Sequence, residues 1–190
     1  MNKLKQLLIV LVCLGSITTN AQKVFNVINH GAAGDGKTDD AIAIQKTIDA
    51  CAAAGGGQVL FPASHVYLSG PIQLKSNINL HLEAGAVLLA NPDEKIYTKS
   101  AFRDNPGEGT IWIGGEKLEN VMLSGLGEIN GNGISFMGAE LEDSYVLKPF
   151  NIMDPRPHVI TIIGGKNIRI HDLKIGNAAY WTIHLIGCDD

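Results

Sequence analysis

Short apolar runs of three to six residues alternate with turn-forming residues along most of the chain. Within several runs apolar and polar side chains alternate, which is the period of a β-strand with one buried face. We therefore predict ten short strands, at residues 23–28, 58–61, 78–82, 87–89, 111–113, 121–123, 160–163, 168–170, 173–175 and 183–186. Glycine, asparagine and aspartate separate them, as expected for turns.

An internal repeat organises these strands. Residues 158–164 align with residues 181–187 at an offset of 23 residues, matching Ile160 with Ile183, Ile162 with Leu185 and Gly164 with Gly187. Two more predicted strands lie between them, so one repeat contains three strands and three turns. A unit of this kind cannot bury its apolar face alone, whereas stacked units share one continuous core. The repeat predicts an all-β fold, a right-handed parallel β-helix.

A second signature, Asn-apolar-x-apolar, begins at Asn77, Asn120 and Asn167. The starts are 43 and 47 residues apart, which corresponds either to two coils each or to one coil plus an insertion. Residues 91–110 and 133–157 are the expected insertions, read as loops on one side of the stack. The alternative fold, an antiparallel sandwich, would need hairpin turns between alternating strands.

One helical segment stands near the N-terminus. Ile44, Ile48 and Cys51 recur at helical spacing and form one apolar face. Thr38 is the expected N-cap, with the two acidic residues after it in the first turn, and the glycines at 55–57 end the helix. Because the first coil of a solenoid exposes open backbone and core, we expect this helix to cap it.

The first 21 residues have the pattern of a secretory signal. Lys3 and Lys5 precede an apolar run at residues 7–14, and Ala21 ends a small-residue cleavage pattern. The run is shorter than the about 20 residues needed to span a bilayer. We expect cleavage near Ala21, secretion or periplasmic location, and no membrane contact afterwards. A lipidated Cys13 is the alternative, although Val12 is larger than the residue normally found before such a cysteine.

The length of residues 22–190 suits one domain or part of a larger one, and we expect the N-terminal part of a single β-helix domain with a mildly acidic balance of charge. The chain has a net charge of −4, with 18% charged and 45% hydrophobic residues, which excludes a disordered tail. This charge gives no reason to expect nucleic acid, which requires a clustered basic face. Cys51 and Cys188 could form a disulfide, but two buried thiols are favoured because one lies on the helix and the other near the end.

Two motifs suggest chemistry that we do not favour. Residues 31–38 match the phosphate-binding pattern G-x-x-x-x-G-K-[ST] at every fixed position. Three nearby carboxylates, a secretory signal and the lack of further βα units argue against a nucleotide, so a turn before the helix is favoured. Asp189 and Asp190 resemble an acid pair, but the repeat aligns them with a turn, and adjacent residues of extended chain point to opposite faces.

The histidines show no metal-ligand spacing, so neither a metal nor a cofactor is expected. His184 is the informative one. If Ile183 and Leu185 point into the core, His184 points outward, in line with Thr161 one coil earlier. Such a row could line a ligand groove, although an exposed histidine without a role is an equal alternative. Trp181 stands in the turn just before it, where an aromatic ring could stack on a sugar or pack in the corner of a coil.

Several stretches resemble the polygalacturonases, the pectin-cleaving family 28 of the glycoside hydrolases. They are residues 25–27 and 34–40, 56–62, 82–86, 127–133, 156–157 and 177–184, so the resemblance covers about residues 24–190. The Trp-x-x-His segment is the most specific of them. Asn130 replaces an aspartate of the family pattern, and Ala178-Ala179 replaces its Ser-Pro.

The resemblance implies hydrolysis of α-1,4-galacturonosyl bonds in pectic polysaccharide with inversion, by two carboxyl groups about 6.5–9.5 Å apart. In the family these acids follow the Trp-x-x-His segment, in motifs that do not occur before Asp190. No catalytic residue is therefore carried over, and we expect an N-terminal portion that is inactive alone and belongs to a monomeric enzyme. His184, Arg156 and Trp181 would contact substrate, because a cationic group suits a uronate carboxylate.

Two other classes stay open. A β-helix pectate lyase would need acidic Ca²⁺ ligands and a basic residue to abstract a proton, and the chain shows no such cluster. A carbohydrate-binding or adhesive solenoid would keep the scaffold without the acids. The sequence distinguishes neither endo from exo attack nor homogalacturonan from rhamnogalacturonan.

Overall fold

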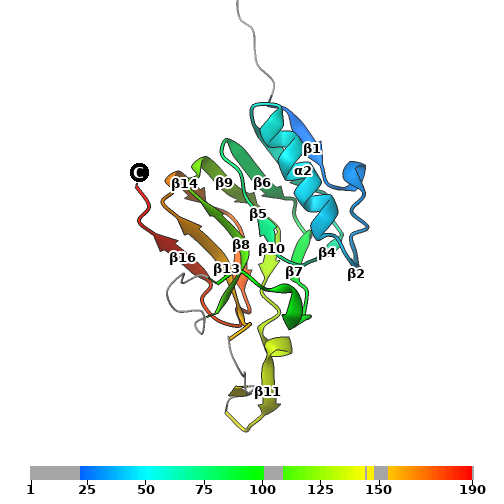
Figure 1. Cartoon of the computed structure of the whole chain (residues 1–190). Coiled ribbons are helices and arrows are strands. Elements are labelled where there is room, and N and C mark those ends of the chain that lie inside the picture. The colour runs from blue at the N-terminus through cyan, green and yellow to red at the C-terminus, as the bar shows by residue number, and fades with distance from the viewer. Residues whose placement is uncertain (1–21, 101–108, 144, 148–153, 190) are drawn as a thin grey trace, which may run out of the picture.

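The computed structural model describes residues 22–100, 109–143, 145–147 and 154–189. It is a right-handed parallel β-helix with one α-helix near its N-terminal end (Figure 1). The predicted signal segment lies outside the described residues. Among the helices of the described part, none is long and apolar enough to cross a membrane.

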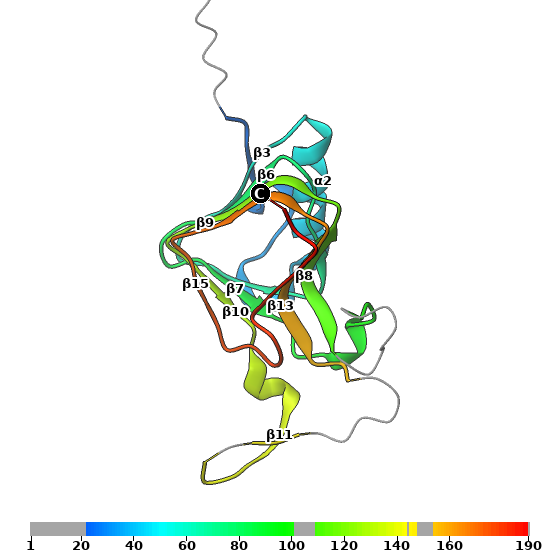
Figure 2. The same cartoon turned by 90° about the vertical axis from the view of Figure 1, so that its left-hand side faces the viewer.

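Three parallel sheets form the walls of the helix. The first contains, in order of pairing, β1 (Val24–Asn26), β3 (Gly57–Phe61), β6 (Ile78–Leu82), β9 (Glu119–Gly125) and β14 (Lys166–Ile170). The second contains β2 (Asp35–Asp39), β4 (Val66–Ser69), β7 (Val87–Ala90), β10 (Glu128–Asn130) and β15 (Lys174–Gly176). The third contains β5 (Ile72–Gln73), β8 (Thr110–Glu116), β13 (Pro157–Ile163) and β16 (Ile183–Ile186). Figure 2 views the coils nearly end-on, so that strands of one sheet overlap.

The register confirms the 23-residue repeat. β13 and β16 are parallel, with Ile160 opposite Ile183 and Ile162 opposite Leu185. β14 and β15 lie between them in the chain, so the coil has three strands, as predicted. The antiparallel sandwich is therefore wrong, because all strand pairs within the three sheets run parallel.

A ladder of asparagines marks one corner of the stack. Asn77, Asn120 and Asn167 adopt left-handed backbone conformations, with φ of 63°, 56° and 50°. The Asn120 side chain donates to Asn77 at 2.9 Å, and the Asn167 side chain donates to Asn120 at 2.8 Å. These residues precede or begin consecutive strands of the first sheet, so each interval is one coil plus an insertion. Asparagine suits this corner because it tolerates the left-handed region.

The two predicted insertions leave the stack at one side. The first contains the 3-10 helix η2 (Glu94–Ile96). The second contains η3 (Gly133–Phe136) and an antiparallel pair, β11 (Met137–Glu140) and β12 (Tyr145–Leu147), where a loop was predicted. We call residues 137–143 and 145–147 the acidic arm; it projects away from the coils (Figures 1 and 2). Tyr97 and Phe136 pack edge-to-face at 5.5 Å and join the bases of both insertions.

Helix α2 (Ala41–Ala53) takes the place of a strand in the first coil. It lies between β2 of the second sheet and β3 of the first, where later coils have a strand of the third sheet. Ile44, Ile48 and Cys51 are fully buried, so the predicted apolar face covers the first coils as expected. The helix ends before the glycines at 55–57, also as predicted.

The predicted start of this helix is wrong. Thr38 belongs to β2, and the helix begins at Ala41 with Asp40 as N-cap residue. The Thr38 hydroxyl donates to Asp35 at 3.0 Å, so it is not directed at a helix amide. Asp39 takes over part of the capping, because its carboxylate accepts the Ala41 amide at 2.9 Å.

The glycine-rich motif at residues 31–38 has internal partners for its amides. The Asp40 carboxylate accepts the amides of Ala33 at 2.6 Å and Gly34 at 3.0 Å. Asp35 accepts the amides of Lys37 and Thr38, and these hydrogen bonds hold the pKa of Asp35 below its usual value. The groups that a phosphate would bind are thus used by the chain's own carboxylates.

Stacked aliphatic side chains fill the interior. Val59, Leu80 and Leu123 lie opposite one another on successive strands of the first sheet and are fully buried. Cys51 is buried and Cys188 is half-buried, and both are free thiols, as the sequence favoured. Burial raises the pKa of the Cys51 thiol.

Candidate functional site

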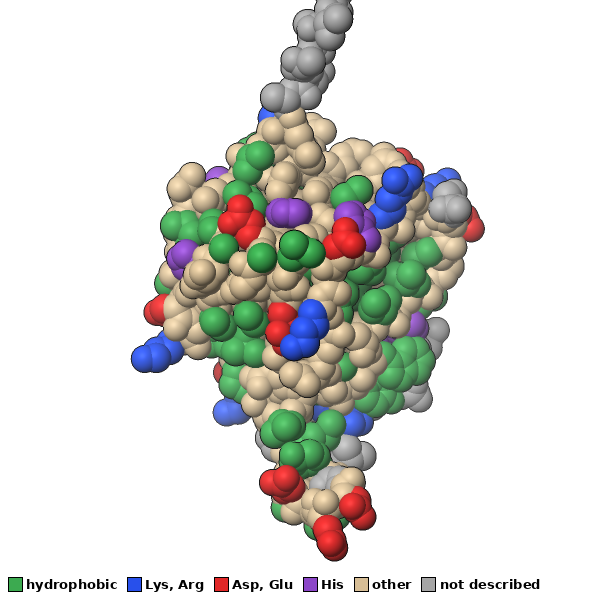
Figure 3. Space-filling view, turned by 180° about the vertical axis from the view of Figure 1, so that it is seen from behind, with side chains coloured by type: hydrophobic (Ala, Val, Ile, Leu, Met, Phe, Trp, Pro, Cys, Tyr) green, Lys and Arg blue, Asp and Glu red, His purple; other side chains and the backbone are tan. Residues whose placement is uncertain are grey.

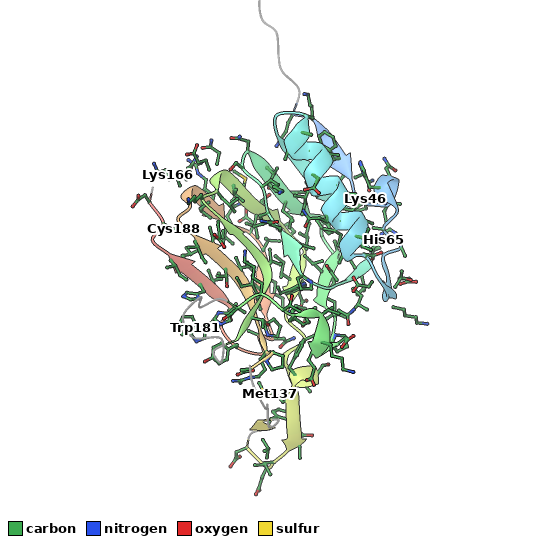
Figure 4. All side chains as sticks on the ribbon, viewed as in Figure 1. Lys46, His65, Met137, Lys166, Trp181 and Cys188 are labelled. Atoms are coloured by element: carbon green, nitrogen blue, oxygen red, sulfur yellow. The ribbon has the colours of Figure 1, made fainter. Side chains whose placement is uncertain are left out.

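Four aromatic rings gather where β13 begins and where the chain turns into β16. We call His158, Tyr180, Trp181 and His184 the aromatic–histidine cluster. The His158 ring lies 4.9 Å from that of Tyr180, 5.3 Å from Trp181 and 5.2 Å from His184, centroid to centroid. Trp181 meets His184 edge-to-face at 4.4 Å. In Figure 4 Trp181 lies on the side of the stack away from Lys46 of α2.

Backbone pairing between two coils sets this geometry. The amide of Val159 donates to the Trp181 carbonyl at 2.9 Å, and that of Ile160 donates to the Thr182 carbonyl at 3.1 Å. Asn177, with φ of 51°, turns the chain away from β15 toward these residues. The 23-residue coil therefore places Trp181 directly beside His158, one coil earlier.

Arg156 lies behind the cluster and not at its open face. Only 9% of the residue is exposed. Its guanidinium forms a bidentate ion pair with Asp154, with Nε at 2.9 Å and 3.0 Å from the two carboxylate oxygens. Its Cζ also lies 4.7 Å from the centre of the Tyr180 ring. The charge of Arg156 is thus balanced internally, and the group braces Tyr180.

The exposed part of the cluster is aromatic and nearly neutral. Trp181 is 47% exposed, and its ring is almost parallel to that of Tyr180. Burial lowers the pKa of His184, which favours the uncharged imidazole near neutral pH. An apolar surface with a few polar ring atoms is the chemistry of many sugar- and small-molecule sites.

The structure brings two of the three predicted substrate-binding residues together at the surface. Trp181 and His184 are in contact, and Arg156 stands behind them. His184 lies opposite Thr161, as the repeat predicts. Thr161, however, is fully buried, so it does not line an open groove; its hydroxyl has no hydrogen-bond partner among the described residues.

Other features of the described residues do not form a competing centre. No group of three or more His, Cys, Asp or Glu side chains in the described ranges could hold a metal ion. Asp189 lies opposite Lys166, as the repeat predicted, but in a parallel β-bridge at the start of β14 and not in the predicted turn; Asp190 is outside the described residues. A groove of about 590 Å³ lies by the asparagine corner, but Lys23 is the one titratable side chain among its described lining residues.

The family assignment follows from residues 24–136. They match the family model described as rhamnogalacturonase A/epimerase, pectate lyase-like. The chain belongs to this family. Its relatives include polygalacturonase-2 of Solanum lycopersicum, 28% identical over 92% of this chain and 36% of the relative. Another is the exo-poly-alpha-D-galacturonosidase of Dickeya chrysanthemi, 36% identical over 61% of this chain and 21% of the relative.

A solved structure supports the fold of this family member. The family 28 exopolygalacturonase of Yersinia enterocolitica superposes with a TM-score of 0.71 at 24% identity, over 88% of this chain and 37% of that one. At this identity the likeness concerns the fold. The chain spans about a third or less of the curated relatives named above. The resemblance to polygalacturonases seen in the sequence is confirmed.

Sequence reasoning missed three members of this candidate site. His158 stands in no recognisable motif, although the 23-residue register pairs its position with Trp181. No sequence pattern marks Asp154 as the partner of Arg156. Gly109, with φ of 80°, packs so closely that a Cβ there would meet the rings of His158 and Tyr180. No local pattern signals this last contact, because the residues are far apart in the chain.

Proposed function

We propose that this chain is the N-terminal portion of a secreted hydrolase that cleaves α-1,4-galacturonosyl bonds of pectic polysaccharide with inversion. The observation that carries the proposal is the aromatic–histidine cluster, placed by the coil register on the wall of a pectate lyase-like β-helix. Relatives named as a polygalacturonase and a galacturonosidase support the substrate class. Trp181 and His184 would contact a sugar unit, with Arg156 holding Tyr180 behind them.

The chain alone should bind but not cleave. Inverting hydrolysis requires an acid and a base about 6.5–9.5 Å apart across the bond. Among the described residues, Asp154 is the carboxylate near the cluster, and it forms an ion pair with Arg156. We therefore assign no catalytic residue among the described residues and expect the acid pair in residues that follow this portion.

The test measures binding of the chain to polysaccharides and, separately, cleavage of pectin by the chain. The purified chain is run in affinity gels containing partially esterified pectin, alginate or a neutral glucan, and reducing-sugar release is measured on pectin. Retardation by pectin alone, without release, is the expected result. Equal retardation by all three polymers, or none by pectin, contradicts the proposed substrate. Release of reducing sugar by this chain contradicts the assignment of the acids elsewhere.

A further inference from the structure

The asparagine ladder lacks one rung. The register of the first sheet places Gly56 where the next coil has Asn77. Asn120 and Asn167 occupy the same position in the two coils after that. Gly56 has φ of 108°, and a Cβ there would collide with the Asn77 carbonyl oxygen, so the position suits glycine. The corner therefore carries no side chain at one coil and an asparagine at each of the next three. We call the space beside Gly56, between Lys23 and Asn77, the ladder gap.

The groove by the asparagine corner, with a volume of about 590 Å³, lies at the ladder gap. Its walls come from four successive coils: Lys23, the turn at residues 54–57, Asn77 with Asn79, and Asn120. Figure 3 shows the surface where the grey trace joins the molecule at Gln22, and it consists mainly of backbone and of side chains that are neither charged nor hydrophobic. Both the size and the polar lining suit a small polar ligand.

Two amides in this wall are held by their neighbours and keep hydrogen-bonding capacity. Asn77 accepts the side-chain amide of Asn120 at 2.9 Å, and Asn79 accepts the hydroxyl of Ser124 at 2.8 Å, both through Oδ1. Among the described residues, neither Nδ2 donates to the protein. An amide nitrogen carries two N–H donors, so the pair offers fixed donors to a ligand that has several oxygens.

Lys23 brings a positive charge to the opposite side of the ladder gap. Its exposed ammonium donates to the Ala54 carbonyl at 2.7 Å, which leaves two of its three N–H donors for a ligand. Lys23 precedes Gly56 by one coil and Asn77 follows it by one coil, so their backbones are about 10 Å apart at the usual strand spacing. A sugar ring that carries a carboxylate on one side and hydroxyl groups on the other bridges such a distance.

We propose that the ladder gap binds one uronate unit of an acidic polysaccharide, with the carboxylate on Lys23 and the hydroxyl groups on the amides of Asn77 and Asn79. This rests on the proposed function, because it gives the pectic polymer a second contact apart from the aromatic–histidine cluster. The missing rung supplies the space, the ladder fixes the amides, and Lys23 favours an acidic unit.

The test removes the two contacts one at a time. Galacturonan trimers are titrated into the purified chain at pH 7 by calorimetry, and two sites are expected. Asn77→Asp removes the N–H donors and adds a negative charge, but it keeps an oxygen that accepts Asn120 and a residue type that tolerates the left-handed backbone. It should weaken one site about tenfold. Trp181→Ala should weaken the other site and leave the ladder gap unchanged.

Matched variants control for charge and for backbone conformation. Ser64 is exposed, has φ of 62° against 63° for Asn77, and does not line the groove. Ser64→Asp should therefore leave trimer binding unchanged. Lys23→Gln should weaken the ladder gap roughly three- to tenfold, whereas Lys37→Gln, at an exposed lysine of β2, should not. Thermal unfolding of every variant checks that the fold is kept.

Each outcome has a defined meaning. If Trp181→Ala alone loses affinity and Asn77→Asp binds like the wild-type chain, the ladder gap is not a site and the proposed pectic function stands. Loss in Asn77→Asp alone supports the ladder gap and contradicts the cluster as the sugar contact. An equal loss in Ser64→Asp overturns the proposal, because any added carboxylate would then have the same effect. If no trimer binds while the fold is intact, both the ladder gap and the pectic substrate are wrong.

Discussion

The two ends of the coil stack carry similar apolar patterns but bury them to different extents. At the N-terminal end α2 lies over the first coils, and Ile48 is fully buried. In β16 at the other end, Ile183 and Leu185 are 44% and 47% exposed, although they lie opposite the fully buried Ile160 and Ile162. The inward direction of a side chain is thus set by its own strand, whereas its burial is set by the neighbouring coil.

Truncating one isoleucine at each end tests this comparison most strongly. Ile48→Ala should lower the free energy of unfolding by roughly 2–5 kcal/mol, because it leaves a cavity between α2 and the first coils. Ile183→Ala should cost less than about 1 kcal/mol, because the side chain already meets solvent. Denaturation in urea measures both. Equal losses at the two sites would show that α2 does not act as the covering element.

A pair of glycines gives a smaller contrast. Gly125 has φ of 116°, and a Cβ there would collide with the Leu82 carbonyl of the preceding coil. Gly187 has φ of 56°, but a Cβ there would meet nothing within 4 Å. Gly125→Ala should cost roughly 2–4 kcal/mol of unfolding free energy, and Gly187→Ala about 1 kcal/mol from backbone strain alone. If the two variants lost similar free energies of unfolding, the backbone angle alone would explain both losses. The close packing of Gly125 against the preceding coil would then be in doubt.

The sequence predicted the coils because each buried strand repeats its pattern in register. Ile160 and Ile183 could be paired by counting, and so could the three strands between them. β2 could not be predicted in this way, because Asp35–Asp39 has no apolar alternation and is held by pairing with β4. The same pairing moved the start of α2 past Thr38. Local capping preference was overridden by tertiary contacts that the local pattern does not contain.

The candidate site was predictable in part for a related reason. Trp181 and His184 belong to one motif, and the register brings them to one wall of the helix. The ion pair that turns Arg156 inward joins two residues at the end of an insertion, and no periodicity of the coils predicts it. The contact of Gly109 with two rings has the same origin. Repeats thus predict positions along the stack, while the insertions between them decide the chemistry of its surface.

The asparagine ladder should contribute modestly to the free energy of unfolding, and Asn120, in its middle, is the position to test. Asn120 both donates to Asn77 and accepts from Asn167, so Asn120→Ala removes two side-chain hydrogen bonds and strains a left-handed backbone. The expected loss is about 1–2 kcal/mol of unfolding free energy. Asn120→Gly removes the same hydrogen bonds but relieves the strain, so it should lose less. If glycine were as costly as alanine, the hydrogen bonds alone would account for the ladder.

The smallest expected effect concerns pH at the end of the stack opposite α2. Burial lowers the pKa of His184 in the folded chain, whereas the unfolded chain should titrate near the ordinary value of about 6.5. Below that pH the unfolded state therefore binds more protons, so the contribution of His184 to stability is complete above about pH 6.5 and falls as the pH is lowered. His184→Gln should flatten the dependence of unfolding free energy on pH between about 5 and 7. His171→Gln is the matched control, because His171 is exposed and hydrogen-bonded to Asp172. If the dependence of unfolding free energy on pH is the same in His184→Gln as in the wild-type chain, the titrating group lies elsewhere. The reason to regard the aromatic–histidine cluster as neutral would then be removed.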